Sequence, residues 1–327
     1  MIPYFDAHCD TVYRCEMTGE GLSIDLGSDA QEQRDYFARA QGLGENGGHI
    51  DLRRAKACFG RYAQIFALFY DPADKPAEGM WGMCRRLYAR FLRETEENAA
   101  SIARCRTGAE IDSAVAAGKA AALLSIEGAD LLECDIDRIP EAAQWGVKLL
   151  NPVWNRANVL SGTNAEDKER GLSDKGRDFI RELEARAIYA DVSHLSDAGF
   201  WDLIKMARRP VVASHSNSRA LCPHPRNLTD DMFRAIRDTG GVVGLNLYLD
   251  FVGAGSMDAL VAHVEHFLSL GGEKTLCLGG DLDGCEALAG GMAGIEDVPA
   301  LYEALCSRGY PAALLEDIFW NNLRRLF

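Results

Sequence analysis

Several absences narrow what this 327-residue chain can be. No uninterrupted apolar run approaches about 20 residues, so no segment is expected to span a membrane. The ten cysteines include no CxxC pair, and no basic region followed by an apolar stretch opens the chain. Both features favour a reduced, cytoplasmic setting. Basic residues are too few to balance the acids, and the net charge of −14 argues against a nucleic-acid partner.

The sequence also lacks internal repeats, low-complexity tracts and linkers rich in proline and serine. Its hydrophobic content of 47% is enough for a large core. Length alone would allow two domains, but an α/β barrel of this size is commonly one. We therefore expect residues 1–327 to form a single domain.

Eight short apolar runs are predicted to be buried parallel strands. Most are continuous rather than alternating, as expected when both faces of a sheet are covered. They span residues 4–8, 64–70, 121–127, 147–154, 188–194, 210–215, 241–247 and 276–281.

Helical patterns lie between these runs. Residues 80–104 have apolar side chains at helical spacing, and Ser173 and Thr229 are suitable N-caps for two further helices. The alternation predicts an α/β fold, a (β/α)8 TIM-type barrel. Residues 11–50 have weak periodicity and several glycines, and they are predicted to form an elaborated first βα loop over the active-site face.

Polar residues with metal-binding chemistry follow these strands. His8 and Asp10 are two positions apart, so on a strand they point the same way. Alone this pair is weak evidence for a metal site, because such a pair more often marks a capped turn in which the histidine is hydrogen-bonded within the protein. However, three of only seven histidines, His8, His194 and His215, occupy strand ends. Imidazole with carboxylate suits zinc best, with manganese, cobalt or iron as alternatives.

Glu127, at the end of another apolar run, is the candidate bridge between two ions. A buried carboxylate needs a cationic partner, and its two oxygens can bind two ions. We expect His8, Asp10 and Glu127 to hold one ion, and Glu127, His194 and His215 to hold the other. Two such metals would share a water and lower its pKa from 15.7 towards about 7, which supplies a bridging hydroxide.

Asp281 and Asp283 compete for the role of proton carrier. Asp281 follows the last strand directly, so it is the preferred residue for taking the proton from the bridging water and passing it to the leaving amine. Asp283, next to Gly284, is assigned to the turn or to substrate binding, since Asp-Gly is a common turn pair.

The chain resembles a known family, the renal (membrane) dipeptidases, which are zinc peptidases of the metal-dependent amidohydrolase superfamily. The resemblance spans nearly the whole chain. It is carried by D-A-H-C-D-T at 6–11, I-D-L at 50–52, S-I-E-G-A at 125–129, D-V-S-H-L-S at 191–196, S-H-S-N-S-R-A at 214–220, H-P-R-N-L at 224–228 and G-G-D-L-D-G at 279–284. It implies two metals with the ligands above and cleavage of dipeptides. It also implies that Arg226 holds the substrate's C-terminal carboxylate, a task that suits a bidentate guanidinium.

One position departs from the family pattern. The family's fourth-strand segment often carries a histidine that binds substrate and polarises the scissile carbonyl, and Trp154 stands there in this chain. An indole donates one hydrogen bond and cannot carry a proton. Stabilisation of the oxyanion is then expected from the metal or from Asn155, and plain packing at the barrel mouth is the alternative role of Trp154.

These observations predict a two-zinc dipeptidase acting on small dipeptides, including those with a D-residue at the C-terminal side, as the resemblance suggests. A different reaction on the same metals, such as lactone, N-acyl or carbamoyl hydrolysis, is the alternative. A metal-binding relative with weak catalysis is another, and Trp154 is the only feature that favours it. The resemblance also allows a homodimer.

The other histidines are assigned plainer roles. His49 is expected in a loop, His224 at the surface or the pocket wall, and His263 and His266 on an exposed helix.

Overall fold

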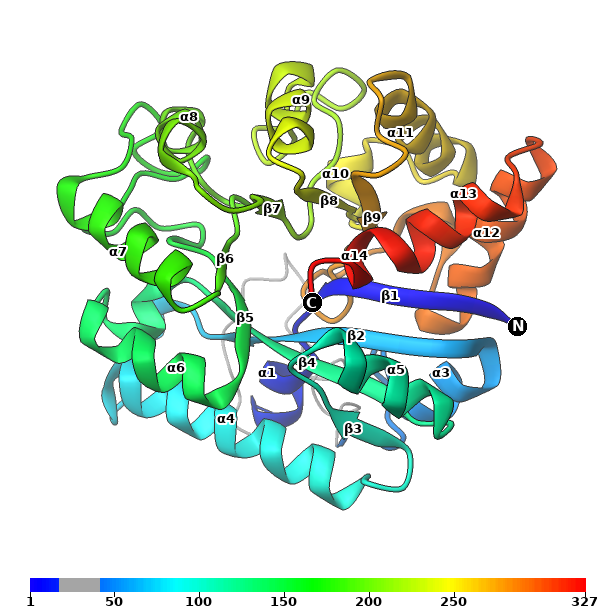
Figure 1. Cartoon of the computed structure of the whole chain (residues 1–327), viewed down its shortest axis with the longest axis horizontal. Coiled ribbons are helices and arrows are strands. Elements are labelled where there is room, and N and C mark those ends of the chain that lie inside the picture. Colours follow the sequence, from blue (N-terminus) through cyan, green and yellow to red (C-terminus); the bar gives the residue numbers. More distant parts are fainter. Residues whose placement is uncertain (18–41) are drawn as a thin grey trace.

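The computed structural model describes residues 1–17 and 42–327. Parallel strands form a nearly closed barrel with helices around it, which confirms the predicted (β/α)8 TIM-type fold (Figure 1). The strands are β1 (Ile2–Cys9), β2 (Phe59–Phe69), β3 (Ile102–Arg104), β4 (Ala120–Glu127), β5 (Val147–Leu150), β6 (Tyr189–Ala190), β7 (Val212–Ala213), β8 (Val242–Leu245) and β9 (Leu276–Leu278). Their order is β6-β5-β4-β2-β1-β9-β8-β7, with β3 added beside β4.

The barrel closes between its two shortest strands, β6 and β7. A single parallel bridge joins Asp191 to Val212, and the Val192 N–H donates to the Val212 carbonyl at 2.8 Å. Each of these strands has two residues, so little backbone pairing holds this edge. The loops that follow β6 and β7 carry His194 and His215.

Helices alternate with the strands along the chain (Figure 1). They are α1 (Thr11–Met17), α3 (Leu52–Cys58), α4 (Gly79–Glu97), α5 (Gly108–Ala116), α6 (Ile139–Trp145), α7 (Asp174–Ala185), α8 (Asp197–Met206), α9 (Asp230–Asp238), α10 (Leu249–Val252), α11 (Met257–Ser269), α12 (Val298–Ser307), α13 (Ala312–Glu316) and α14 (Asn322–Arg324). Short 3-10 turns and one π-helical turn, Asp317–Asn321, complete the structure. Ser173 and Thr229 cap α7 and α9 as predicted, since each side chain accepts a hydrogen bond from the third residue along.

Several predicted boundaries were wrong, and β6 and β7 in particular are shorter than the runs 188–194 and 210–215. The helix expected over 80–104 ends at Glu97, and Ile102–Arg104 forms β3 instead, because it pairs with β4. The strand expected over 147–154 ends at Leu150, two residues before Pro152, which has no N–H to continue a ladder. Residues 11–17 of the predicted first loop form α1. Residues 18–41 of that loop lie outside the described residues.

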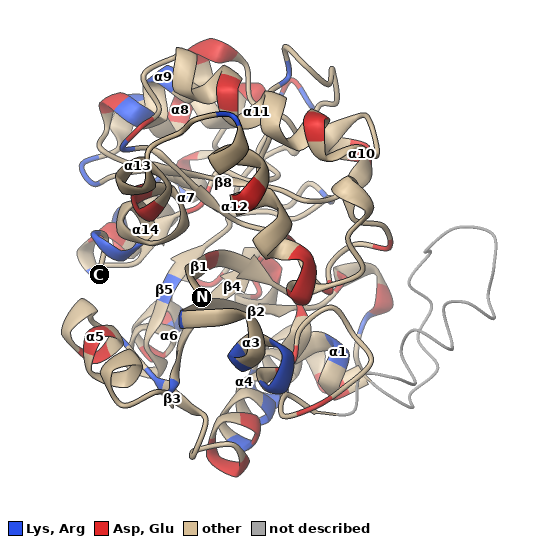
Figure 2. Cartoon of the chain, turned by 90° about the vertical axis from the view of Figure 1, so that its right-hand side faces the viewer, with Lys and Arg blue, Asp and Glu red and all other residues tan. Residues whose placement is uncertain are grey.

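Apolar side chains pack against the strands in two clusters. One holds Phe5 and Ala7 of β1 with Trp320 near the C-terminus, and the larger one holds Tyr4 and Cys9. Phe5 and Ala7 are two positions apart and share a face, as the two-residue period of a strand requires. Cys9 falls in the other cluster, and the pairing of β1 with β2 has a register shift between Asp6 and Cys9. Acidic and basic residues are interspersed on the surrounding helices (Figure 2).

Within residues 1–17 and 42–327, no helix has both the length and the apolarity that crossing a membrane requires.

Candidate metal centre

The five predicted ligands meet at the carboxyl ends of four strands. His8 and Glu127 belong to β1 and β4, Asp10 follows β1, and His194 and His215 follow β6 and β7. All five are buried, with at most 5% exposure. Parallel strands open onto one face at their carboxyl ends, and this brings together residues more than 200 positions apart.

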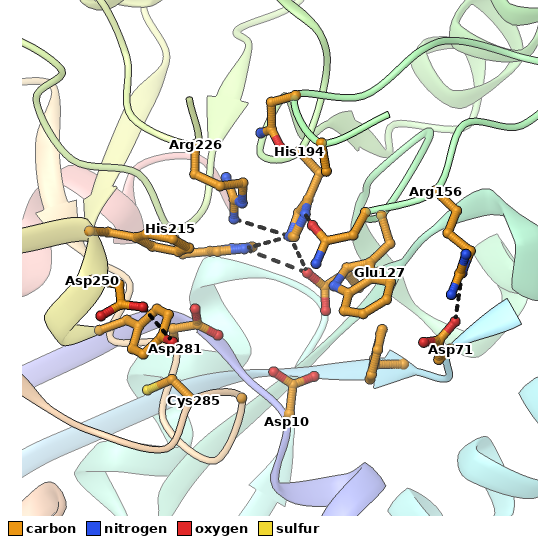
Figure 3. Close-up of a pocket in the computed structure, with 18 of the residues that line it drawn as sticks. Asp10, Asp71, Glu127, Arg156, His194, His215, Arg226, Asp250, Asp281 and Cys285 are labelled. Atoms are coloured by element: carbon orange, nitrogen blue, oxygen red, sulfur yellow. Dashed lines mark hydrogen bonds and ion pairs between the residues drawn. The ribbon is translucent and has the colours of Figure 1, made fainter. Parts of the chain in front are cut away.

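Glu127 lies at the centre of this group (Figure 3). Its Oε1 is 2.8 Å from His194 Nε2 and 3.5 Å from His215 Nε2. Its Oε2 is 3.5 Å from His8 Nε2, which is itself 3.2 Å from Asp10 Oδ2. The ligand atoms of His8, Asp10 and Glu127 lie within 4.8 Å of one another, as do those of Glu127, His194 and His215. The two oxygens of Glu127 therefore face two separate sets of donors.

The histidines are held so that their Nε2 atoms face the centre. His194 Nδ1 is 2.9 Å from Asn155 Oδ1, and His215 Nδ1 is 2.7 Å from Ser214 Oγ. An amide oxygen only accepts, so His194 carries its proton on Nδ1 and its Nε2 has a lone pair. The Nε2 atoms of His194 and His215 are only 3.1 Å apart. Imidazole nitrogens that converge in this way suit a shared metal site.

The electrostatics of the site also suit cations. Burial raises the pKa of Glu127 and of Asp281, with the neighbouring Asp10 carboxylate adding to the rise. Burial lowers the pKa of His194 and His215 well below the usual value, so both imidazoles are neutral, as metal ligands must be. Asp10 Oδ1 is buried without a hydrogen-bond partner among the described residues. Bound cations would compensate this buried negative charge, so the residues present fit a divalent metal.

Asp281 lies beside this group, in the loop after β9. Its Oδ1 is 3.8 Å from His8 Nε2, and its Oδ2 accepts a hydrogen bond of 3.0 Å from Asn246 Nδ2. The carboxylate can therefore reach a group at the centre while Asn246 holds it. Ligand atoms of His8, His215 and Asp281 also lie within 4.8 Å of one another, so geometry would allow Asp281 to bind metal as well.

Asp283 lines the same cavity, but its carboxylate oxygens contact three protein donors. Thr11 Oγ1, Arg14 Nη1 and the His49 N–H each donate to it at 2.6 Å. Its predicted part in substrate binding stays a prediction. Its place in a turn agrees with its left-handed backbone, φ +67°.

A cavity of about 630 Å³ opens over the centre, a size typical of small-molecule sites. Arg226 lines it and is only 6% exposed. Arg226 Nη2 is 3.0 Å from His194 Nε2, and its Nε and Nη1 have no hydrogen-bond partner among residues 1–17 and 42–327. Burial lowers the pKa of this guanidinium. A buried cation with unused hydrogen-bond donors beside the centre can bind an anionic group.

Trp154 forms part of the cavity wall beside Glu127. Its ring lies 4.8 Å from that of Phe69 and 6.1 Å from that of His194. Asn155 also lines the cavity, with its amide oxygen on the ring of His194. Its observed contact is therefore with a candidate ligand.

Sequence reasoning missed several residues around the centre. Asn246 follows β8 directly, so the rule that found the other strand-end residues could have found it. Arg14 and His49 gave no signal of this kind. His263 was expected to be exposed, which was wrong: it is 1% exposed, and its Nδ1 accepts a 3.1 Å hydrogen bond from the Ser218 N–H. His224 was expected either at the surface or at the pocket wall, and it lines the cavity.

The chain matches a protein-family model described as membrane dipeptidase, peptidase family M19, over residues 1–327. A protein of Klebsiella pneumoniae, described as an uncharacterized protein in the pqqA 5′ region, is 36% identical over 242 residues, covering 70% of this chain and 86% of that protein.

Two solved structures are similar over 99% of this chain. One is a metallopeptidase from Rhodobacter sphaeroides liganded with a phosphinate mimic of the dipeptide L-Ala-D-Ala; it is 25% identical, with a TM-score of 0.82 and 98% of that chain covered. The other is dipeptidase AC, a metallopeptidase of family M19; it is 27% identical, with a TM-score of 0.84 and 97% of that chain covered.

Proposed function

Because this chain belongs to the membrane dipeptidase family, peptidase family M19, and is a metallopeptidase, we propose that it hydrolyses small dipeptides with two zinc ions. The observation that carries the proposal is the position of Glu127 between two sets of donors. His8, Asp10 and Glu127 would hold one ion, and Glu127, His194 and His215 the other. When bound, such ions lower the pKa of water and polarise a carbonyl oxygen.

Arg226 defines where the substrate is cut. Its unused donors suit the C-terminal carboxylate of a peptide, which a guanidinium can bind through two parallel hydrogen bonds. Because Arg226 Nη2 is only 3.0 Å from a candidate metal ligand, a carboxylate held there leaves room for one residue before the peptide bond at the centre. This spacing favours cleavage of the last peptide bond of a very short peptide.

Asp281 would carry the proton. Its Oδ1 lies 3.8 Å from His8 Nε2, so the carboxylate is within reach of a group bound at the centre, as proton transfer requires. Asn246 holds the Oδ2 atom and leaves Oδ1 turned towards His8. In this role Asp281 takes a proton from the attacking water and delivers it to the leaving amine.

We further propose that the substrates include dipeptides with a C-terminal D-residue. The Rhodobacter sphaeroides metallopeptidase was solved with a mimic of L-Ala-D-Ala, and its fold matches this chain almost throughout. A cytoplasmic location is also proposed, because all ten cysteines lie in the described part of the chain and are free thiols.

The test is hydrolysis of a dipeptide library by protein of measured metal content. We expect close to two equivalents of zinc or a similar ion, cleavage of L-Ala-D-Ala or related dipeptides, and loss of activity on chelation that zinc restores. N-acyl amino acids, lactones and carbamoyl compounds belong in the same panel. Faster turnover of one of these, or full activity in metal-free protein, would contradict the proposal.

A further inference from the structure

Four residues form a buried cluster next to the metal centre, which we name the Asp283 lock: Thr11, Arg14, His49 and Asp283. Three donors converge on the Asp283 carboxylate, each at 2.6 Å: the Thr11 hydroxyl, Arg14 Nη1 and the His49 N–H. In return, the Asp283 N–H donates to His49 Nδ1 at 2.9 Å. The lock therefore joins three segments, α1, the residues before α3 and the loop after β9.

The lock lies between two acids of the centre. Asp10 immediately precedes Thr11, and Asp281 is two residues before Asp283. The Asp10 N–H also donates to the Leu282 carbonyl at 3.0 Å. The β9 loop therefore cannot shift away from the end of β1 without breaking two hydrogen bonds, the one from the Asp10 N–H to Leu282 and the one from the Thr11 hydroxyl to Asp283.

Gly284 shows how closely these segments approach. A Cβ atom at this position would lie 2.2 Å from Asp10 Oδ2 and 2.4 Å from Asp281 Oδ1. Both distances are far below van der Waals contact, so the loop backbone lies directly against the two carboxylates. A small displacement of the loop would therefore move Asp281 or press on Asp10.

The loop backbone needs to be held in this position. Asp281 and Asp283 both have left-handed backbone, with φ of +57° and +67°. Residues other than glycine adopt this region at an energetic cost, and the surrounding structure must impose it. The paired hydrogen bonds between Asp283 and His49 are one restraint of this kind.

The lock also contains a buried ion pair, between Arg14 and Asp283. Arg14 is 0% exposed, and burial would raise the pKa of Asp283, but the Arg14 guanidinium and His49 hold it below the usual value. A buried charge without its partner is strongly unfavourable, so each member keeps the other in place. Arg14 belongs to α1, and its N–H donates to the Asp10 carbonyl at 3.1 Å, which ties the ion pair to the metal-binding end of β1.

We propose that the Asp283 lock is a positioning device, which fixes Asp10 and Asp281 relative to one another at the metal centre. This inference rests on the proposed function, since it assigns the lock to the reaction that those two acids serve. Asp283 is thus a positioning residue that acts through its neighbours in the chain and through Arg14.

The main test is Asp283→Asn, which keeps the size of the side chain and removes its charge. Zn²⁺ affinity is measured by titration of metal-free protein against a chromophoric chelator, and kcat and KM are measured with L-Ala-D-Ala on zinc-loaded protein. We expect zinc affinity and kcat to fall by about 10–100-fold, the usual effect of losing a partner that orients metal ligands. KM should change little, because Arg226 is untouched.

Two further comparisons separate positioning from simple support of the fold. Glu94→Gln is the matched control: Glu94 is also a buried carboxylate that accepts from a backbone N–H and pairs with an arginine, but it lies outside the cavity. It should leave zinc affinity and kcat at wild-type levels. His49→Ala should lower both without changing any charge in the Asp283–Arg14 pair, and His49→Asn, which retains an acceptor for the Asp283 N–H, should recover part of the loss.

Folded Asp283→Asn protein with wild-type zinc affinity and kcat would overturn the proposal. If this variant does not fold, the double variant Arg14→Gln with Asp283→Asn removes the charge of the buried cation as well, and zinc affinity, kcat and KM are measured on that variant instead. If the wild type binds zinc but cleaves no dipeptide, the proposed function fails while zinc affinity still tests the lock. Equal losses in Asp283→Asn and Glu94→Gln would show a general effect on the fold and contradict positioning.

Discussion

At the scale of single residues, the site depends on side chains whose partners fix their chemistry. His194 is an example, because Asn155 sets its tautomer and its left-handed backbone, φ +77°, sets its direction. A histidine in this conformation is uncommon, and such strain is typical of functional positions. The orientation of one imidazole thus requires both a local backbone cost and a neighbouring amide.

Arg226 is expected to recognise the substrate carboxylate. Arg226→Ala should reduce kcat/KM for free dipeptides by an amount equivalent to about 2–5 kcal/mol, as loss of a buried charged partner does. Dipeptide amides lack the carboxylate, so they should be poor substrates of the wild type and little affected by the substitution. Steady-state kinetics on both substrates, with metal content measured, checks this. Equal losses on both would point to a structural arginine.

Trp154 is expected to be a wall of the cavity. Its ring packs against Phe69 at 4.8 Å, and the metals already supply stabilisation of the oxyanion in the proposed mechanism. Trp154→Phe should therefore keep most activity, and Trp154→His should be tolerated. If the indole N–H donates to the oxyanion, kcat of Trp154→Phe would instead fall by about 10²–10³. A thousandfold loss of kcat in Trp154→Phe at normal metal content would show that Trp154 is more than a wall of the cavity.

At the scale of elements, the weakest edge of the barrel carries two candidate ligands. Strands β6 and β7 have two residues each, and Asp191 reinforces their junction. Its Oδ1 accepts hydrogen bonds of 3.0 Å from the N–H groups of Ser193 and Ser214, the residues before His194 and His215. One buried carboxylate oxygen thus connects the backbone before both histidines.

Asp191→Ala should therefore affect both stability and metal binding. Leaving two buried N–H groups without an acceptor costs about 1–3 kcal/mol each, so the free energy of unfolding in urea should fall by that order. Zinc affinity should fall as well. Ser173→Ala removes the cap of α7 and should cost about 1 kcal/mol of stability with unchanged zinc affinity. Unchanged zinc affinity in Asp191→Ala would show that the junction does not orient the histidines.

At the scale of the whole molecule, buried titratable groups make stability depend on pH. Burial lowers the pKa of His49 from 6.5 to about 4. The unfolded chain therefore binds a proton that the folded protein excludes between these values, so this stabilisation is present above pH 6.5 and is lost as the pH falls towards about 4.

The His49 contribution can be measured by comparison with His49→Asn. The difference of about 2.5 pKa units corresponds to about 3 kcal/mol at most, from 1.36 kcal/mol per unit. Unfolding in urea at pH 7 and at pH 4.5 should show a larger loss for the wild type than for the variant. Parallel losses in the two proteins would show that His49 titrates normally in the folded state.

The amino-acid sequence by itself determined the fold class and brought out the candidate ligands. Continuous apolar runs of strand length predict a parallel sheet, and parallel strands end on one face whatever their loops do. For this reason His8, Glu127 and His215 could be grouped before any contact was known, and the structure brings their ligand atoms close together. The caps Ser173 and Thr229 were also predictable, because capping is a local interaction.

Only the tertiary structure decided the contacts between loops. The partners of Asp283 lie at Arg14 and His49, more than 230 positions away along the chain, and no local pattern marks them. The burial of His263 depends likewise on contacts with residues outside its own helix, the N–H of Ser218 and the carbonyl of Val252. Periodicity describes one segment at a time. Charge pairing and burial arise between segments, so they become visible only when the barrel brings those segments together.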